Sequence, residues 1–200
     1  MKMIWLIVAF WAISDSHTNL DQETIHRLAV HPSSTLAIHG KTNVNTYECS
    51  ISEYNGTDTL SLKAKRGKGA VFTKGQVQLK ASEFDCGMKL MTKDFGETIK
   101  ADQYPFITID FISFERMPHY ELSEEKFMGK LTISIADVKT PMDVRCGIVK
   151  GEDGFIHLRG SHKMKFSDFN LTAPSRMLGA VKVEERINVN FHLVLSLQKP

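Results

Sequence analysis

The chain has 200 residues, of which 42% are hydrophobic and 24% charged, as in a globular domain with a core of its own. Its 25 basic side chains nearly balance 23 acidic ones, so the net charge is +2. This balance argues against nucleic acid as a partner, because phosphate recognition needs a strongly basic face.

The first residues follow the order of segments in a signal peptide. Lys2 supplies a positive charge, and the apolar run Met3–Ala12 is too short for a bilayer-spanning helix of ~20 residues. Ala12-Ile13-Ser14 then places small residues before Asp15, as a cleavage site requires. We expect a signal peptide over residues 1–14 and a periplasmic or secreted mature protein. The alternative for this run is an N-terminal core strand.

Alternating apolar and polar residues predict several strands in the first part of the chain. The pattern covers Leu36–Val44, Leu60–Leu62 and Val77–Leu79. Because successive side chains of a strand point to opposite faces, each stretch has one dry face. Turn-type sequences at Tyr54–Gly56 and Arg66–Gly69 separate the strands.

A different period covers Ser82–Ala101. Its apolar residues recur at spacings of three and four, which predicts one amphipathic helix against the sheet. These residues are Met88, Met91, Phe95 and Ile99. Gly87 and Gly96 are the places where the helix would break, and the turn Ala101–Pro105 ends it.

Alternation resumes after this helix and continues to the C-terminus. The strands expected there cover Ile107–Phe111, Leu131–Ile135, Met142–Ile148, Ile156–Leu158 and Ile187–Leu197. The polar stretch Met117–Lys126 between two of them is expected to be an exposed loop. Many strands joined by short turns, with a single helix, predict an antiparallel meander that forms a barrel or a sandwich.

The three cysteines permit one disulfide and one free thiol. Cys49 and Cys146 alternate with apolar residues and should face inward, whereas Cys86 lies at the start of the expected helix. Oxidising compartments allow disulfides to persist, so we favour a Cys49–Cys86 bridge that ties the helix to the strand beneath it. Three buried free thiols remain the alternative.

Motifs for catalysis and metal binding are absent from the sequence. It has no Gly-x-Ser-x-Gly elbow, no Walker or dinucleotide-binding glycine pattern and no His-x-His pair. His157 and His162 should face opposite sides of a strand, and His192 should be solvated on the face opposite the apolar stripe. We therefore expect no enzyme, no metal site and no cofactor other than a bound lipid.

A series of short motifs in a fixed order resembles the YceI-like family of exported, lipocalin-like proteins. The motifs are Phe84–Gly87, Lys100–Pro105, Gly129–Ile133, Val138–Pro141, Ser167–Phe169 and Leu178–Val183. The resemblance implies an all-β fold, an eight-stranded antiparallel up-and-down barrel with one amphipathic helix near one end. It also implies an apolar tunnel for polyisoprenoid or fatty-acyl chains. Asn170 stands where the family usually has glycine, and asparagine tolerates the left-handed conformation.

These observations predict an N-terminal segment over residues 15–33 and a barrel domain over residues 34–198. We expect the barrel to hold a long apolar or amphiphilic lipid, so that the protein acts as a carrier or sequestering protein. The residues expected to line the tunnel are Ile109, Phe111, Leu131, Ile133, Phe191 and Leu193, with Met91 and Phe95 closing one side. Plain core packing is the alternative role for each of them. The alternative function is a ligand-free interaction module that acts through loops such as Met117–Lys126. Transient contact with a membrane or a partner protein fits both functions.

Overall fold

The structure is a computed structural model that describes residues 24–65, 67, 69–121, 123–176 and 178–198. The strands in this part of the chain are β1 (Ile25–Val30), β2 (Thr35–Lys41), β3 (Thr46–Ile51), β4 (Thr59–Ala64), β5 (Ala70–Lys74), β6 (Gln76–Lys80), β7 (Phe106–Phe114), β8 (Glu125–Ile135), β9 (Val138–Lys150), β10 (Ile156–Lys165), β11 (Ser175–Arg176), β12 (Val181–Lys182) and β13 (Arg186–Gln198). The helix α1 covers Lys89–Thr98, and short 3-10 turns cover Ala81–Glu83 and Phe166–Phe169.

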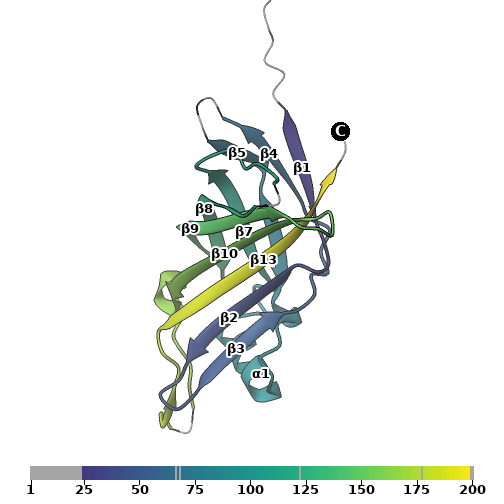
Figure 1. The fold of residues 1–200 in the computed structure, drawn as a ribbon. Helices are drawn as coiled ribbons and strands as arrows, with labels where there is room; N and C mark the ends of the chain where they lie inside the picture. The colour runs from purple at the N-terminus through teal and green to yellow at the C-terminus, as the bar shows by residue number, and fades with distance from the viewer. Residues whose placement is uncertain (1–23, 66, 68, 122, 177, 199–200) are drawn as a thin grey trace, which may run out of the picture.

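Within the described residues, eleven strands form one antiparallel sheet that closes because β13 pairs with β1 as well as with β10. β1 and β2 follow one another along one side of β13, and β4 and β3 pair with them in turn. In the same way β5 and β6 follow one another along β7. With each of these pairs counted as one interrupted strand, the sheet is a closed eight-stranded up-and-down barrel (Figure 1).

Gly75 interrupts the strand formed by β5 and β6, because the chain passes close to β7 there. A Cβ atom on Gly75 would lie 1.9 Å from the carbonyl oxygen of Phe111. The Phe111 amide donates to the Gly75 carbonyl over 2.9 Å, and the β7–β8 ladder shifts register between Phe111 and Ser113. This close approach requires glycine and produces the local irregularity that is typical of a bulge.

The helix α1 lies at one end of the barrel, beside β3 (Figure 1). In the described residues no ladder joins β3 to β6; instead Asp85 and Ser50 exchange backbone hydrogen bonds of 2.8 and 2.9 Å. A disulfide between Cys49 and Cys86 joins the same two segments. The residues before α1 are thus fastened to the edge of β3, which positions the helix over this end of the barrel, hereafter the α1 end.

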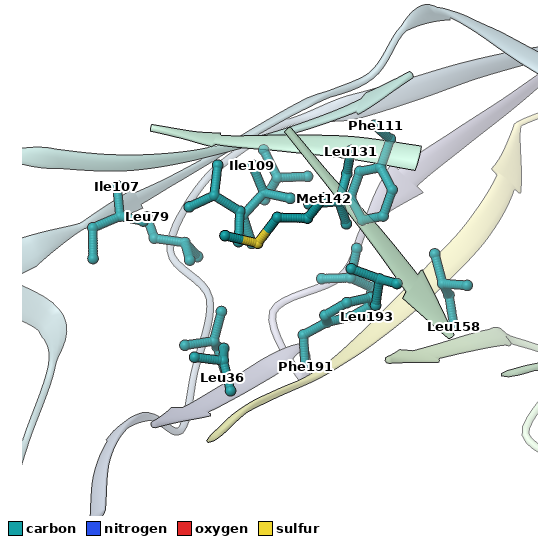
Figure 2. Packing of buried hydrophobic residues seen from close by; sticks show 14 of the residues in the cluster. Leu36, Leu79, Ile107, Ile109, Phe111, Leu131, Met142, Leu158, Phe191 and Leu193 are labelled. Atoms are coloured by element: carbon teal, nitrogen blue, oxygen red, sulfur yellow. The ribbon is translucent and has the colours of Figure 1, made fainter. Parts of the chain in front are cut away.

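The barrel interior is filled by side chains from all sides. Figure 2 shows Leu36, Phe191 and Leu193 projecting from β2 and β13 toward residues of the opposite wall such as Ile109 and Met142. Away from the α1 end, aromatic rings form a continuous contact chain with centroid separations of 4.6 to 5.9 Å. The rings are those of Phe72, Phe111, Phe114, Phe127 and Phe191. This cluster closes the half of the barrel that is distant from the helix.

The closed barrel, with one α-helix among the described residues, confirms the fold class expected from the sequence. Asn170 adopts the left-handed conformation with φ of 55°, as expected for a residue in place of glycine. The expected signal peptide, residues 1–14, lies outside the described residues.

Several expected boundaries were wrong. The barrel begins at β1, before Ser34, because Leu28 and Val30 face the core while β1 pairs with β4 and β13. The helix is shorter than Ser82–Ala101, because the residues before Lys89 form a 3-10 turn and the contact with Ser50. Gly96 does not break it.

Two apolar residues of the expected strands are exposed, and the end of the expected loop is a strand. Val44 lies in the turn after β2, and Leu197 lies near the end of β13. The last residues of the expected loop Met117–Lys126 belong to β8, where Glu125 pairs with Ile148.

Candidate ligand-binding cavity

An apolar cavity of about 210 Å³ lies at the α1 end of the barrel. It is bounded by α1, by β3 with the turn before it, and by the hairpin of β11 and β12. Apolar side chains supply most of its wall, namely Tyr47, Met88, Leu90, Met91, Phe95, Phe166, Pro174, Val181 and Val183. Its polar groups come from Thr42, Asp94, Thr98 and Arg176.

Two local contacts fix α1 as one wall of this cavity. The Phe95 ring packs against Phe84, with centroids 4.9 Å apart, while Phe84 itself is buried in the core. At the start of the helix, the Cys86 amide donates to Oγ1 of Thr92 over 3.0 Å. Both contacts hold α1 against the segment that precedes it, so Phe95 faces inward.

The β11–β12 hairpin forms the opposite wall and is held from two directions. Asn43, in the turn after β2, donates through Nδ2 to the Ala180 carbonyl over 2.9 Å and accepts from the Lys182 amide at Oδ1 over 2.9 Å. On the other side, Nε of Arg176 donates to Oδ2 of Asp94 over 2.7 Å, and the Arg176 guanidinium also forms an ion pair with Oδ1 of Asp94. The hairpin is thus joined both to the turn and to the helix.

Two smaller cavities lie deeper in the barrel. One of about 40 Å³ is lined by residues that include Ile38, Ile99, Ile107 and Ile135, and it shares Tyr47, Phe95 and Phe166 with the larger cavity. Another of about 10 Å³ lies between Leu36, Leu79, Ile109, Phe111, Phe191 and Leu193. A single water molecule needs about 10–15 Å³, so side chains occupy nearly all of the interior.

The residues expected to line a tunnel fall into two groups. Ile109, Phe111, Leu131, Ile133, Phe191 and Leu193 are all buried within the barrel, where they pack as core. Four of them border the smallest cavity, namely Ile109, Phe111, Phe191 and Leu193. Met91 and Phe95 instead line the larger cavity, and Phe95 also borders the middle one. Their role in holding a ligand stays a prediction.

The larger cavity has few polar groups in its wall. Burial raises the pKa of Tyr47 to about 12, so this phenol stays neutral at physiological pH. Asp94 is mostly buried but is compensated by Arg176. A mostly apolar wall with a few polar groups is typical of sites for apolar or amphiphilic ligands.

A pair of histidines is the polar feature that the sequence did not predict. Nδ1 of His157 lies 2.8 Å from Nε2 of His192, and the rings are stacked. Nε2 of His157 lies 3.2 Å from Oδ1 of Asp153. His192 is therefore half-buried rather than solvated, because β10 places His157 beside it. Across the residues that the structure describes, no group of three or more His, Cys, Asp or Glu side chains is arranged to hold a metal ion.

The short hairpin that closes the cavity was not predicted from the sequence. β11 and β12 have two residues each, which is too short for alternation to be visible. Proline at 174 and glycine at 179 are the turn signals that mark this segment. No helix in the described part of the chain has the length and apolar character needed to cross a membrane.

Comparisons with known proteins address the family and the fold. The family model of the YceI-like domain matches residues 11–195. A polyisoprenoid-binding domain from Saccharophagus degradans has a TM-score of 0.64 and 12% sequence identity, and the match covers 88% of this chain and 100% of that chain. BcnA of Burkholderia cenocepacia has a TM-score of 0.60 and 18% identity, covering 82% of this chain and 96% of that chain. No curated protein sequence matches.

Proposed function

The chain belongs to the YceI-like family, and on that premise we propose that it binds a long apolar or amphiphilic lipid of the polyisoprenoid or fatty-acyl type. The ligand enters at the α1 end, and the cavity between α1 and the β11–β12 hairpin is the observation that carries this proposal. The likeness in fold to a polyisoprenoid-binding domain supports the class of ligand.

The chemistry of the cavity suits a hydrocarbon chain. Its wall is mostly apolar, and its few polar groups include the paired side chains of Asp94 and Arg176. Each methylene group transferred from water to such a wall contributes about 0.8 kcal/mol. A chain of several isoprene units therefore binds tightly without any charged anchor inside the barrel.

The length of the ligand requires movement of side chains inside the barrel. The cavity of about 210 Å³ is smaller than the roughly 300–1,000 Å³ of typical ligand sites. Phe95 and Phe166 border both this cavity and the next one, so they separate the two. A chain that displaces these rings passes from the mouth toward Ile109, Phe111, Phe191 and Leu193. The aromatic cluster beyond Phe111 sets the depth at which it stops.

We assign the protein a carrier or sequestering role outside the cytoplasm, after removal of residues 1–14. The Cys49–Cys86 disulfide supports this location, because such bonds persist in oxidising compartments. N-terminal sequencing of the protein recovered from its native host tests the cleavage before Asp15. Recovery of the uncleaved chain in the cytoplasm would contradict the assignment.

Native mass spectrometry of the gently purified full chain tests the binding. We expect a population heavier than the polypeptide, and a matching lipid in the organic extract. As a second arm, delipidated protein is mixed with a fluorescent polyprenol and with a fluorescent fatty acid. A protein that purifies without lipid and takes up neither probe would overturn the proposal.

The filled interior favours one alternative, a ligand-free interaction module that acts through its loops. The two deeper cavities, of about 40 and 10 Å³, leave space for no lipid chain without rearrangement. In that case neither probe binds, and the protein behaves as a rigid barrel. The same experiment therefore separates the two functions.

A further inference from the structure

Large apolar side chains gather around the mouth of the cavity. Met88 and Leu90 line the cavity and are nevertheless 59% and 61% exposed, and Val44 in the turn after β2 is 70% exposed. Leu178, in the turn between β11 and β12, is fully exposed. We call these four residues the apolar rim. They come from three separate elements that meet at the α1 end of the barrel (Figure 1).

The rim is held together rather than assembled from independent loops. Asn43, next to Val44, bonds to Ala180 just before β12 and to Lys182 within it, and Arg176 of β11 is paired with Asp94 of α1. Leu178 has a left-handed backbone with φ of 55°. A branched apolar residue is uncommon in that conformation, and its side chain is directed away from the protein. This geometry displays the leucine instead of burying it.

The helix α1 and the β11–β12 hairpin, which adjoin the rim, have a positive net charge. The helix α1 and the segment 175–182 together carry four basic side chains and two acidic ones. The acidic side chains, Asp94 and Glu97, are paired with Arg176 and Lys93. Lys89 and Lys182 have no ion-pair partner among the described residues, and Lys89 lies between two rim residues in the sequence.

We propose that the apolar rim and its two unpaired lysines dock on an anionic lipid surface, and that the ligand passes between the bilayer and the cavity there. This inference rests on the proposed function, because the rim surrounds the entrance of the proposed lipid site. Exposed apolar side chains that insert at the interface, with lysines at the level of the headgroups, are typical of proteins that bind membranes peripherally. A ligand that enters here leaves the bilayer without crossing water.

Sedimentation with vesicles measures the docking. The full chain is mixed with vesicles of phosphatidylglycerol and phosphatidylcholine, and in parallel with vesicles of phosphatidylcholine alone. The rim variant is Val44→Gln with Leu178→Asn, two residues outside the cavity wall, and asparagine suits the left-handed backbone at 178. The control variant, Ile25→Gln with Leu197→Asn, removes two exposed apolar side chains at the opposite end of the barrel.

We expect the wild-type protein to prefer the anionic vesicles, and the preference to weaken as salt is added. The rim variant should partition at least about tenfold more weakly, because two inserting side chains are lost. The control variant should partition within about twofold of the wild type. Equal binding of the rim variant and the wild type, or binding to neither kind of vesicle, would overturn the docking.

Uptake of a fluorescent polyprenol separates this inference from the proposed function. Delivered from dilute ethanol, the probe should bind the wild type and the rim variant alike; delivered in anionic vesicles, it should reach the rim variant more slowly. If both proteins take up the probe from ethanol, and also take it up from vesicles at the same rate, the docking alone is refuted. Failure of the folded wild type to take up the probe from ethanol refutes the proposed function itself.

Discussion

Arg176 on β11 donates a hydrogen bond of 2.7 Å from Nε to Oδ2 of Asp94 on α1. This contact joins the hairpin to the helix across the mouth of the cavity, so it restricts the path of a ligand. We predict that Arg176→Gln accelerates release of a bound fluorescent polyprenol by about fivefold. This factor corresponds to a barrier to release that is lower by about 1 kcal/mol. Stopped-flow transfer to an acceptor measures the release.

The stability of the same variant provides the check. Arg176 is 47% exposed, so the free energy of unfolding should fall by about 1 kcal/mol or less. Arg176→Lys keeps the positive charge and should release the probe at a rate closer to that of the wild type. An unchanged release rate in Arg176→Gln would show that the hairpin does not restrict the entrance.

The disulfide between Cys49 and Cys86 should make a large contribution to stability. These residues are 37 positions apart, and closing a loop of that length contributes about 3–4 kcal/mol in the chain-entropy model. We predict a loss of this size in the double variant Cys49→Ala/Cys86→Ala, measured by urea unfolding. Alkylation of the wild type should label Cys146 alone and only after unfolding, because burial raises the pKa of its thiol to about 12. Labelling of two or three thiols without reductant would contradict the pairing.

The interior of the barrel tests whether its side chains form a filled core. Leu193 borders a cavity of about 10 Å³ and faces the ring of Phe111. Leu193→Trp should therefore lower the free energy of unfolding by about 1–3 kcal/mol, the usual cost of overpacking. Lys163→Trp on the exposed face of β10 is the control and should change stability by about 0.5 kcal/mol or less. If Leu193→Trp leaves stability unchanged, the barrel is more open than its packing indicates.

The histidine pair predicts a dependence of stability on pH. Burial, with the neighbouring charges of Arg159 and His157, lowers the pKa of His192 below its usual 6.5. The unfolded chain therefore binds a proton more readily than the folded protein does. The contribution of His192 is fully present above pH 6.5 and is lost as the pH falls through its lowered pKa.

Unfolding in urea at several pH values measures this dependence. His192→Gln should have a flatter decline in unfolding free energy below pH 6.5 than the wild type. His162→Gln, on the same pair of strands but outside the histidine contact, should decline as the wild type does. Identical slopes in His192→Gln and the wild type would contradict the assignment.

The strands could be predicted where alternation continues over many residues. From Val189 to Leu195 every second side chain is buried, which is the pattern that identified the last strand. β1 was missed because Arg27 and His26 leave only two clearly alternating apolar positions before the turn. Its assignment depends on pairing with β4 and β13, which are distant in the sequence.

The candidate site was predictable only in part. Helical spacing correctly indicated that Met91 and Phe95 lie on the inner side of α1. The other wall comes from a hairpin held by Asn43 and Arg176, whose partners Ala180 and Asp94 are 137 and 82 residues away in the sequence. No local pattern encodes such contacts, because the turn after β2, the helix and the hairpin meet only in the folded barrel. The cavity between them therefore appeared only with the structure.

The most direct test of the lipid-binding account compares the fluorescent polyprenol bound at saturation by two tryptophan variants of α1. Met91→Trp fills the cavity, whereas Lys93→Trp places the same side chain on the exposed face of the same helix. We predict that folded Met91→Trp loses most of the binding and that Lys93→Trp keeps the wild-type amount. Wild-type binding by Met91→Trp, with both variants folded, would contradict the account.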